Sequence, residues 1–426
     1  MKKILGPFVL LFLVFFHIYQ QALPVFGSSF IIASGSIGLL VYLLNGRPFP
    51  EIIGVGLAYV PFVVTSVISG YANAGIDAYL WANTKSQAGW LFSAYLIVYL
   101  FFIIHQRGHY ITLLYYMVAA VAVQCIISIL MYQNSAINTF FTSIQMQDTL
   151  IISKREDTEG ERLLGFGIAF FGAGIICGSA LILITYIMIR KKMGLLLLAF
   201  WSSVYSLILF IGLLSARTTM VGLLASIVFA VSVFIFGKSQ NKWQFLKFAA
   251  ISGGLSTIAS TLCYIYFPEF ADWAFEAFIN YSETGEFSTK SSDSLEYMFL
   301  FPRTFNEWLF GIGTMNFMGF DVGYSRLLFY AGIPGMLAFF FYEFALAKFA
   351  CTKDMTQNLM MLTFCGYSLA LNVKGLAEVN SFLYIFVFYF WYYKHYIYRP
   401  QLYRLGKINS NKLRYAVQSP TSRRRI

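Results

Sequence analysis

Long apolar runs recur along the whole chain and are separated by short polar turns. Of the 426 residues, 58% are hydrophobic and only 12% are charged, whereas a soluble domain carries roughly 25% charged residues. A helix needs about 20 apolar residues to cross the hydrocarbon of a bilayer. The chain is therefore predicted to be an all-α polytopic membrane protein with about 12 transmembrane helices. The predicted spans are about residues 4–21, 29–45, 52–70, 88–105, 110–132, 164–189, 194–214, 217–237, 247–267, 323–346, 356–373 and 379–396.

The distribution of charge sets the orientation. With the N-terminus in the cytoplasm, 21 of the 30 Lys and Arg residues fall on the cytoplasmic side, and 16 of the 19 Asp and Glu residues fall outside. This asymmetry follows the positive-inside rule, and it explains the net charge of +11 without nucleic acid as a partner. Both termini are predicted to be cytoplasmic. Of the acidic residues, Glu51, Glu343 and Asp354 are assigned to the cytoplasmic side.

The predicted organisation is a transmembrane bundle over residues 1–398 and a basic cytoplasmic tail over residues 399–426. Anionic lipid headgroups would hold such a tail against the membrane. Two sizeable extracytoplasmic loops are expected, at about 133–163 and 268–322. The second loop contains the largest cluster of mixed charge. Because charge is costly in lipid, this loop is expected to lie in water.

Two outer arginines run against the orientation bias. Arg217 lies in LLSARTTMVGLL, a turn too short to be a real loop, and Arg162 precedes the glycine-rich GFGIAFFGAG. An arginine fork donates two parallel hydrogen bonds to phosphate, so both residues are candidates for an anion site. The alternatives are a snorkelling or capping arginine at position 217 and ordinary helix packing for the glycines after Arg162.

The second outer loop supplies further candidates. It contains Glu296 and Arg303 among serines, carboxylates and aromatic residues, a mixture that suits sugar hydroxyls and the apolar faces of sugar rings. At the end of the loop, Asp321 and Tyr324 are expected at the water boundary. Arg326 follows about one turn inside the next span, where a charge should face the bundle interior.

Lys374 and Glu378 flank the short outer turn before the last span. They are candidates for substrate binding, or they simply pair with each other at the i and i+4 positions. No metal site or nucleotide-binding motif is predicted. The four histidines lie outside both large outer loops, the five cysteines lack metal-ligand spacing, and the sequences GxxxxGK and GxSxG are absent.

Taken together, LLSARTTMVG, ERLLGFGIAFFGAG, one large late outer loop and the closing FGIGTMNF…DVGYSRLLFYAGIPGMLAF resemble the Wzy-type O-antigen and capsule polysaccharide polymerases. These enzymes are similar to the O-antigen ligases, and both belong with the membrane-embedded C-type glycosyltransferases. The resemblance covers most of the chain in architecture, but only these short motifs in sequence.

The resemblance implies a helical bundle like that of the C-type glycosyltransferases. It also implies an enzyme of the bacterial plasma (inner) membrane, active on its outer face, towards the periplasm or cell exterior. Such an enzyme transfers a growing glycan from undecaprenyl pyrophosphate to a lipid-linked repeat unit and needs no cofactor or metal. The implied partners are the undecaprenyl-pyrophosphate-linked oligosaccharide, membrane lipids and a chain-length regulator protein. Within this mechanism, Arg162 and Arg217 would stabilise the leaving pyrophosphate. Arg303 and Arg326 are the next candidates for the same role. Asp321, Glu296 or Glu378 would accept the proton of the acceptor hydroxyl.

Two alternatives remain at the level of sequence. An O-antigen ligase is expected to carry an essential histidine in the large outer loop, and the segment from Pro268 to Tyr324 contains none. A flippase or transporter of lipid-linked oligosaccharides also has many spans and buried basic residues. Flippases usually have short loops on both faces, which favours the enzyme.

Overall fold

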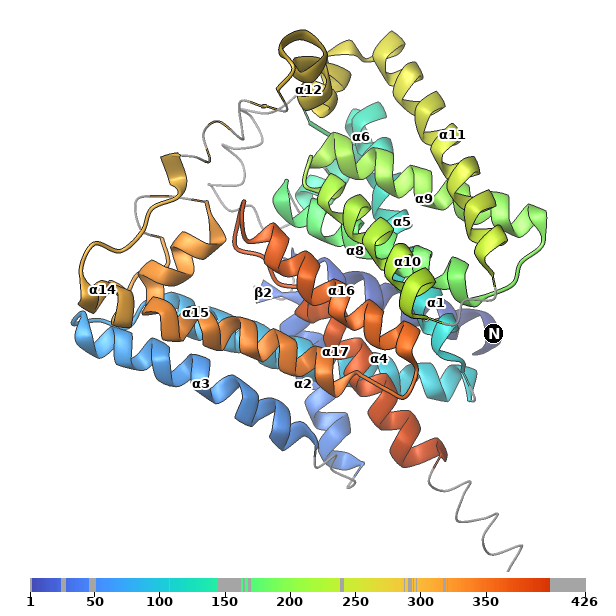
Figure 1. Ribbon diagram of the computed structural model, residues 1–426. Helices are drawn as coiled ribbons and strands as arrows, with labels where there is room; N and C mark the ends of the chain where they lie inside the picture. The colour runs from blue at the N-terminus through green and yellow to red at the C-terminus, as the bar shows by residue number, and fades with distance from the viewer. Residues whose placement is uncertain are drawn as a thin grey trace, which may run out of the picture.

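The computed structural model is almost entirely α-helical (Figure 1). The structure describes residues 2–23, 28–45, 51–106, 108–144, 162–163, 165–167, 170–237, 241–286, 288–289, 293, 295, 297–316, 319 and 321–398. The tail predicted over residues 399–426, most of the loop at 133–163, and Glu296 lie outside these residues.

The N-terminal half comprises α1 (Lys2–Ile18), β1 (Ala22–Leu23), β2 (Ser28–Ser29), α2 (Phe30–Leu44), α3 (Glu51–Ala72), α4 (Ala78–His105), α5 (Tyr110–Gln133), α6 (Ser135–Ser143) and α8 (Phe171–Arg190). The C-terminal half comprises α9 (Leu195–Ser215), α10 (Thr219–Phe236), α11 (Lys242–Tyr266), α12 (Pro268–Thr284), α14 (Phe305–Phe310), α15 (Gly323–Phe349), α16 (Met355–Leu371), α17 (Asn380–Tyr392) and the π-helix η3 (Tyr393–Tyr398). The two short strands pair antiparallel.

A helix is found at each of the twelve predicted spans. Among the described residues, eight helices are long and apolar enough to cross a membrane, namely α3, α4, α5, α8, α9, α10, α11 and α15. The apolar stretches Leu5–Ile18 and Phe30–Leu44 are shorter, as are α16 with 17 residues and α17 with 13. The chain is thus a polytopic membrane protein, while the number of twelve crossings stays a prediction.

Helix α8 lies at the centre of the fold and packs against α5, α9, α10 and α16. Its residues from Gly178 to Ile189 are all buried. Gly178 meets Gly222 of α10 so closely that neither position has room for a Cβ atom. Small residues at such a contact let two helix backbones approach, which is a common basis of helix association in membranes.

Helix α15 is kinked where the end of the large outer loop contacts it. Ala331 and Gly332 leave the helical conformation, Gly332 with φ +66°, and Pro334 follows. The carbonyls freed by the kink find other donors: Phe329 O accepts from Ile312 N at 2.6 Å, and Tyr330 O accepts from Ser69 Oγ at 2.7 Å. The kink therefore fixes the loop to α15 and α15 to α3, which run side by side in Figure 1.

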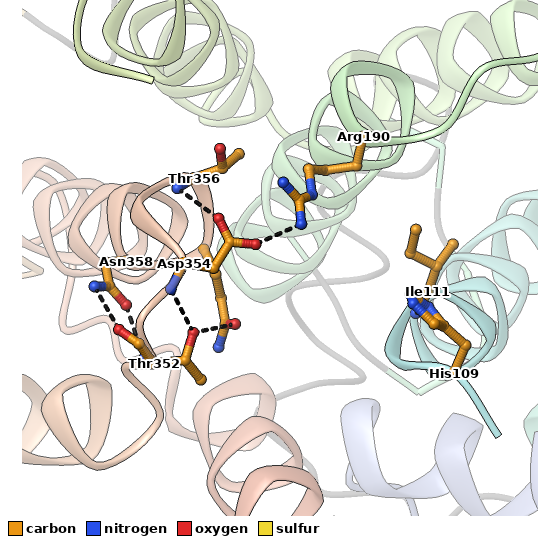
Figure 2. A network of polar contacts seen from close by, with 8 residues as sticks. His109, Ile111, Arg190, Thr352, Asp354, Thr356 and Asn358 are labelled. Atoms are coloured by element: carbon orange, nitrogen blue, oxygen red, sulfur yellow. Dashed lines mark hydrogen bonds and ion pairs between the residues drawn. The ribbon is translucent and has the colours of Figure 1, made fainter. Parts of the chain in front are cut away.

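On the predicted cytoplasmic side, a polar network joins the end of α8 to the start of α16 (Figure 2). Arg190 forms an ion pair of 2.5 Å with Asp354, whose carboxylate also accepts from Thr356 N at 3.1 Å as the N-cap of α16. Thr352 accepts two further hydrogen bonds, at Oγ1 from Asp354 N at 3.1 Å and at its backbone O from Asn358 Nδ2 at 2.9 Å. These polar contacts lie at turns that the positive-inside rule assigns to the cytoplasm.

Candidate functional site

The two arginines singled out by the sequence meet on one aromatic ring. Cζ of Arg162 lies 4.7 Å from the centre of the Trp273 ring, and Cζ of Arg217 lies 4.6 Å from the same ring. Trp273 belongs to α12, in the predicted second outer loop. Cation–π contacts at this distance are attractive, so the indole offsets part of the repulsion between the two guanidinium groups.

A backbone hydrogen bond joins the two chain segments that carry Arg162 and Arg217. Leu163 N donates to Leu214 O at 3.0 Å, which joins the segment carrying Arg162 to the end of α9 just before Arg217. Further along the same segment, Phe166 O accepts hydrogen bonds from the amides of Gln21 at 2.7 Å and Gln124 at 2.8 Å. Buried side-chain amides on α5 and in the turn after α1 thus anchor the segment to the bundle.

Arg217 contacts α12 through two of its three nitrogens. Its Nε donates to Trp273 O at 2.8 Å, and Nη2 lies 2.5 Å from Glu276 Oε2, with both side chains less than one-fifth exposed. The third nitrogen, Nη1, is buried and has no hydrogen-bond partner among the described residues. Arg217 is therefore held against α12, and one of its buried donors is unpaired among the described residues.

Lys374 and Asp321 belong to the same electrostatic neighbourhood. Burial lowers the pKa of Lys374, the positive charges of Arg217 and Arg162 lower it further, and the negative charge of Asp321 raises it. The charges of all three groups therefore act on the Lys374 ammonium. We call Arg162, Arg217 and Lys374 the cation cluster, to which separate segments of the chain contribute.

Lys374 and Glu378 do not form an ion pair with each other. Glu378 instead accepts hydrogen bonds from Gln87 Nε2 at 2.6 Å and from Asn380 Nδ2 at 2.8 Å. The charges of the two arginines act on Lys374, whereas Glu378 is hydrogen-bonded to side chains of α4 and α17. The turn between α16 and α17 thus presents its two ionisable side chains to different surroundings.

Three of the remaining predicted site residues have structural contacts of their own. Arg326 Nε donates to Met315 O at 3.1 Å, and Tyr324 Oη donates to Leu369 O at 2.8 Å. Arg303 is exposed, and its backbone N–H donates to Glu307 at 2.7 Å. No hydrogen bond or ion pair within the described part of the chain joins any of the three to the cation cluster.

Two acidic residues make contacts that the sequence did not predict. Glu276 was not identified, although it lies one helical turn after Trp273. Glu343 was assigned to the cytoplasmic side, but it is 2% exposed inside the bundle. Its carboxylate accepts from Ser368 Oγ at 2.8 Å and from the backbone N of Val379 at 3.3 Å. The start of α17 therefore reaches Glu343 inside the bundle, while the side of the membrane on which Glu343 lies stays a prediction.

An apolar cavity of about 450 Å³ lies beside the segments that carry Arg162 and Arg217. Helices α5, α9, α11 and α12 line it, together with Leu163 and Leu214, the two residues that the backbone hydrogen bond joins. Arg162 is the chain neighbour of Leu163, and Arg217 follows Leu214 by three residues. The chain segments that carry the two arginines thus also contribute to the wall of an apolar cavity.

No metal centre is found within the described ranges, where no group of three or more His, Cys, Asp and Glu side chains is placed to hold a metal ion. Comparisons with protein-family models, with curated proteins and with solved structures find no match to this chain.

Proposed function

We propose that this chain is a polymerase of bacterial surface polysaccharide. It would transfer a growing glycan from undecaprenyl pyrophosphate to a lipid-linked repeat unit on the outer face of the plasma membrane. The observation that carries the proposal is the convergence of Arg162 and Arg217 on Trp273, with Lys374 in electrostatic reach. The motifs that resemble the polysaccharide polymerases contain both arginines.

The charge of the cluster favours a polyanionic ligand. Three cations close together in a partly buried site repel one another, and this repulsion is relieved when an anion binds. A pyrophosphate carries several negative charges and can take hydrogen bonds from two guanidinium groups at once. Arg217 Nη1, buried and without a partner among the described residues, is a donor that such an anion could use.

The apolar cavity beside the cluster suits the other half of the substrate. A polyprenyl chain is entirely apolar and gains from contact with apolar side chains such as those that line the cavity. A headgroup bound at Arg162 and Arg217 would place the start of its lipid chain beside Leu163 and Leu214. One ligand with a pyrophosphate head and a hydrocarbon tail would thus satisfy both features.

The proposed reaction is a glycosyl transfer. The acceptor hydroxyl oxygen forms a bond to the anomeric carbon of the donor glycan, and the bond from that carbon to the pyrophosphate oxygen breaks. The electron pair leaves with the lipid pyrophosphate, where the cation cluster stabilises the developing charge. The hydroxyl proton passes to a carboxylate, for which Asp321, exposed and within electrostatic reach of Lys374, is our assignment.

The experiment is the length distribution of surface polysaccharide in the native host after Arg217→Ala replaces the wild-type gene. Removing one donor to a developing oxyanion costs roughly 3 kcal/mol, or about 100-fold in rate, so long chains should disappear while single repeat units are still exported. Arg303→Ala is the matched control, because Arg303 is exposed on the same outer loop. Repeat units trapped on the cytoplasmic face would show a flippase, and unchanged polymer would overturn the proposal.

A further inference from the structure

A second cavity, of about 220 Å³, lies between the end of α1, the first turns of α4 and the turn that precedes α17. Its lining is polar and aromatic, unlike that of the apolar cavity. The polar and aromatic lining residues are two amides, a serine, a carboxylate and two aromatic side chains, and Ala82 and Leu376 complete the wall. These polar and aromatic residues are Gln20, Asn83, Ser86, Glu378, Tyr79 and Trp90.

The carboxylate of Glu378 is held on one side only. Its Oε2 accepts from Gln87 and Asn380, and Gln87 Oε1 in turn accepts from Tyr384 Oη at 3.0 Å. Its Oε1 accepts no hydrogen bond from the described residues. A carboxylate fixed in this way at a cavity wall offers an acceptor with two lone pairs to whatever enters.

The two aromatic rings are also fixed. Trp90 Nε1 donates to His17 O at 3.2 Å, and Tyr79 Oη accepts from Asn83 Nδ2 at 3.1 Å. Asn83 is itself held by Tyr59, whose hydroxyl donates to it at 2.8 Å. Rigid rings beside a few placed polar groups are typical of small-molecule sites.

The charge of this cavity selects its ligand. Glu378 Oε1 is an acceptor and would face the acceptor oxygens of a phosphate unfavourably, and the described residues that line the cavity include no Lys or Arg to bind such an anion. A neutral ring with several hydroxyl groups fits better, because each hydroxyl can donate to the carboxylate while the ring faces contact Tyr79 and Trp90. The volume suits one sugar ring rather than a longer glycan.

We propose that this cavity binds one neutral sugar ring of the lipid-linked glycan, with Glu378 Oε1 as the acceptor for a ring hydroxyl. The inference rests on the proposed polymerase function. The turn before α17 links this cavity to the cation cluster. The charges of the two arginines act on Lys374 at one end of the turn, and Leu376 and Glu378 line the cavity at the other. Pyrophosphate and sugar would therefore bind on different sides of one turn.

The test fills the cavity without touching the hydrogen-bonded network around it. Ala82 lines the cavity and is exposed, so Ala82→Trp adds bulk there, whereas Ala88→Trp adds the same bulk at an exposed position of α4 outside the cavity. Full-length wild type and variants are reconstituted in vesicles. Two quantities are measured: binding of undecaprenyl pyrophosphate, which carries no sugar, and polymerisation of the lipid-linked repeat unit from the native host.

We expect Ala82→Trp to bind undecaprenyl pyrophosphate like wild type but to raise the KM for the repeat unit about tenfold or more, an equivalent of about 1.4 kcal/mol. Ala88→Trp should match wild type in both assays. Glu378→Gln, which puts an amide donor where the acceptor was, should raise the KM in the same direction. If Ala82→Trp polymerises with the wild-type KM, the proposal that this cavity binds a sugar ring is wrong. If wild type neither binds undecaprenyl pyrophosphate nor polymerises, the proposed function itself fails.

Discussion

Arg217 and Glu276 form an ion pair of 2.5 Å between the α9–α10 turn and α12, and both side chains are largely shielded from water. The carboxylate partly neutralises the cation cluster when no other anion is present. A substrate pyrophosphate and the Glu276 carboxylate would both be attracted to the positive charge of Arg217 and would repel each other. This repulsion would remain even if the pyrophosphate accepted a hydrogen bond from Nη1, which Glu276 does not use. The helix of the large outer loop is thereby coupled to the anion site.

This coupling predicts that Glu276→Gln binds undecaprenyl pyrophosphate several-fold more tightly than wild type. The amide oxygen can still accept from Arg217, but the negative charge that opposes an incoming anion is gone. Affinity measured at two salt concentrations checks the cause, because the difference between variant and wild type should shrink as salt screens the charges. Weaker binding by the variant would instead mean that Glu276 is needed to orient Arg217.

Trp273 should stabilise the protein through both arginines at once. Each cation–π contact is worth about 0.5–2 kcal/mol, so Trp273→Ala should lower the melting temperature in detergent and weaken pyrophosphate binding. Trp308→Ala is the matched control, because that indole lies in the same outer loop and stacks on Phe301 rather than on an arginine. Equal effects of the two substitutions would speak against the shared ring as the support of the cluster.

The pH dependence of stability should carry a contribution from Glu378. Burial raises the pKa of this carboxyl from 4.5 to about 7, against the opposing effect of the Gln87 and Asn380 amides. The folded state therefore binds more protons than the unfolded state between these values, and stability should fall as pH rises from about 4.5 to about 7. The titratable groups on neighbouring helices that interact with Glu378 are Tyr59, Tyr79, Tyr342, Glu343 and Tyr384.

The measurement is thermal unfolding of wild type and Glu378→Gln at matched pH values. The amide does not titrate, so the difference between the two curves isolates this carboxyl. A difference that does not change between pH 4.5 and pH 7 would contradict the assignment.

On the predicted cytoplasmic side, Asp354 should matter more for stability than Arg190, with which it pairs (Figure 2). The ion pair is partly exposed, 42% for Arg190 and 30% for Asp354, and such pairs contribute roughly 0–1 kcal/mol. Asp354 also caps α16, and loss of an N-cap costs about 1 kcal/mol in addition. Asp354→Ala should therefore destabilise more than Arg190→Ala, and Asp354→Ser should recover most of the difference.

The helices were predictable because their signal is local. Length and apolar character within a single segment suffice to predict a span, and helices lie at all twelve predicted positions. How far a turn reaches into the bundle depends instead on contacts between segments that are distant in the sequence. The turn before α17 reaches Glu343 on α15, and nothing in the sequence near position 343 indicates that contact.

The candidate site was predictable in part. Arg162 and Arg217 were identified because a charge among apolar segments is costly and therefore indicates a functional site. Their common partner Trp273 could not be identified, because it lies more than fifty residues further along the chain, among other aromatic residues of the outer loop. The sugar cavity combines the ends of α1 and α4 with a distant turn, a combination that only the fold creates.

The most direct measurement is the binding of undecaprenyl pyrophosphate and undecaprenyl monophosphate to the full-length chain in vesicles, compared among wild type, Arg162→Ala, Arg217→Ala and Arg303→Ala. If the cation cluster binds a pyrophosphate, wild type should prefer the pyrophosphate, the first two variants should lose about tenfold or more in affinity for it, and Arg303→Ala should match wild type. Equal affinity of wild type and the two cluster variants for the pyrophosphate would contradict the central claim.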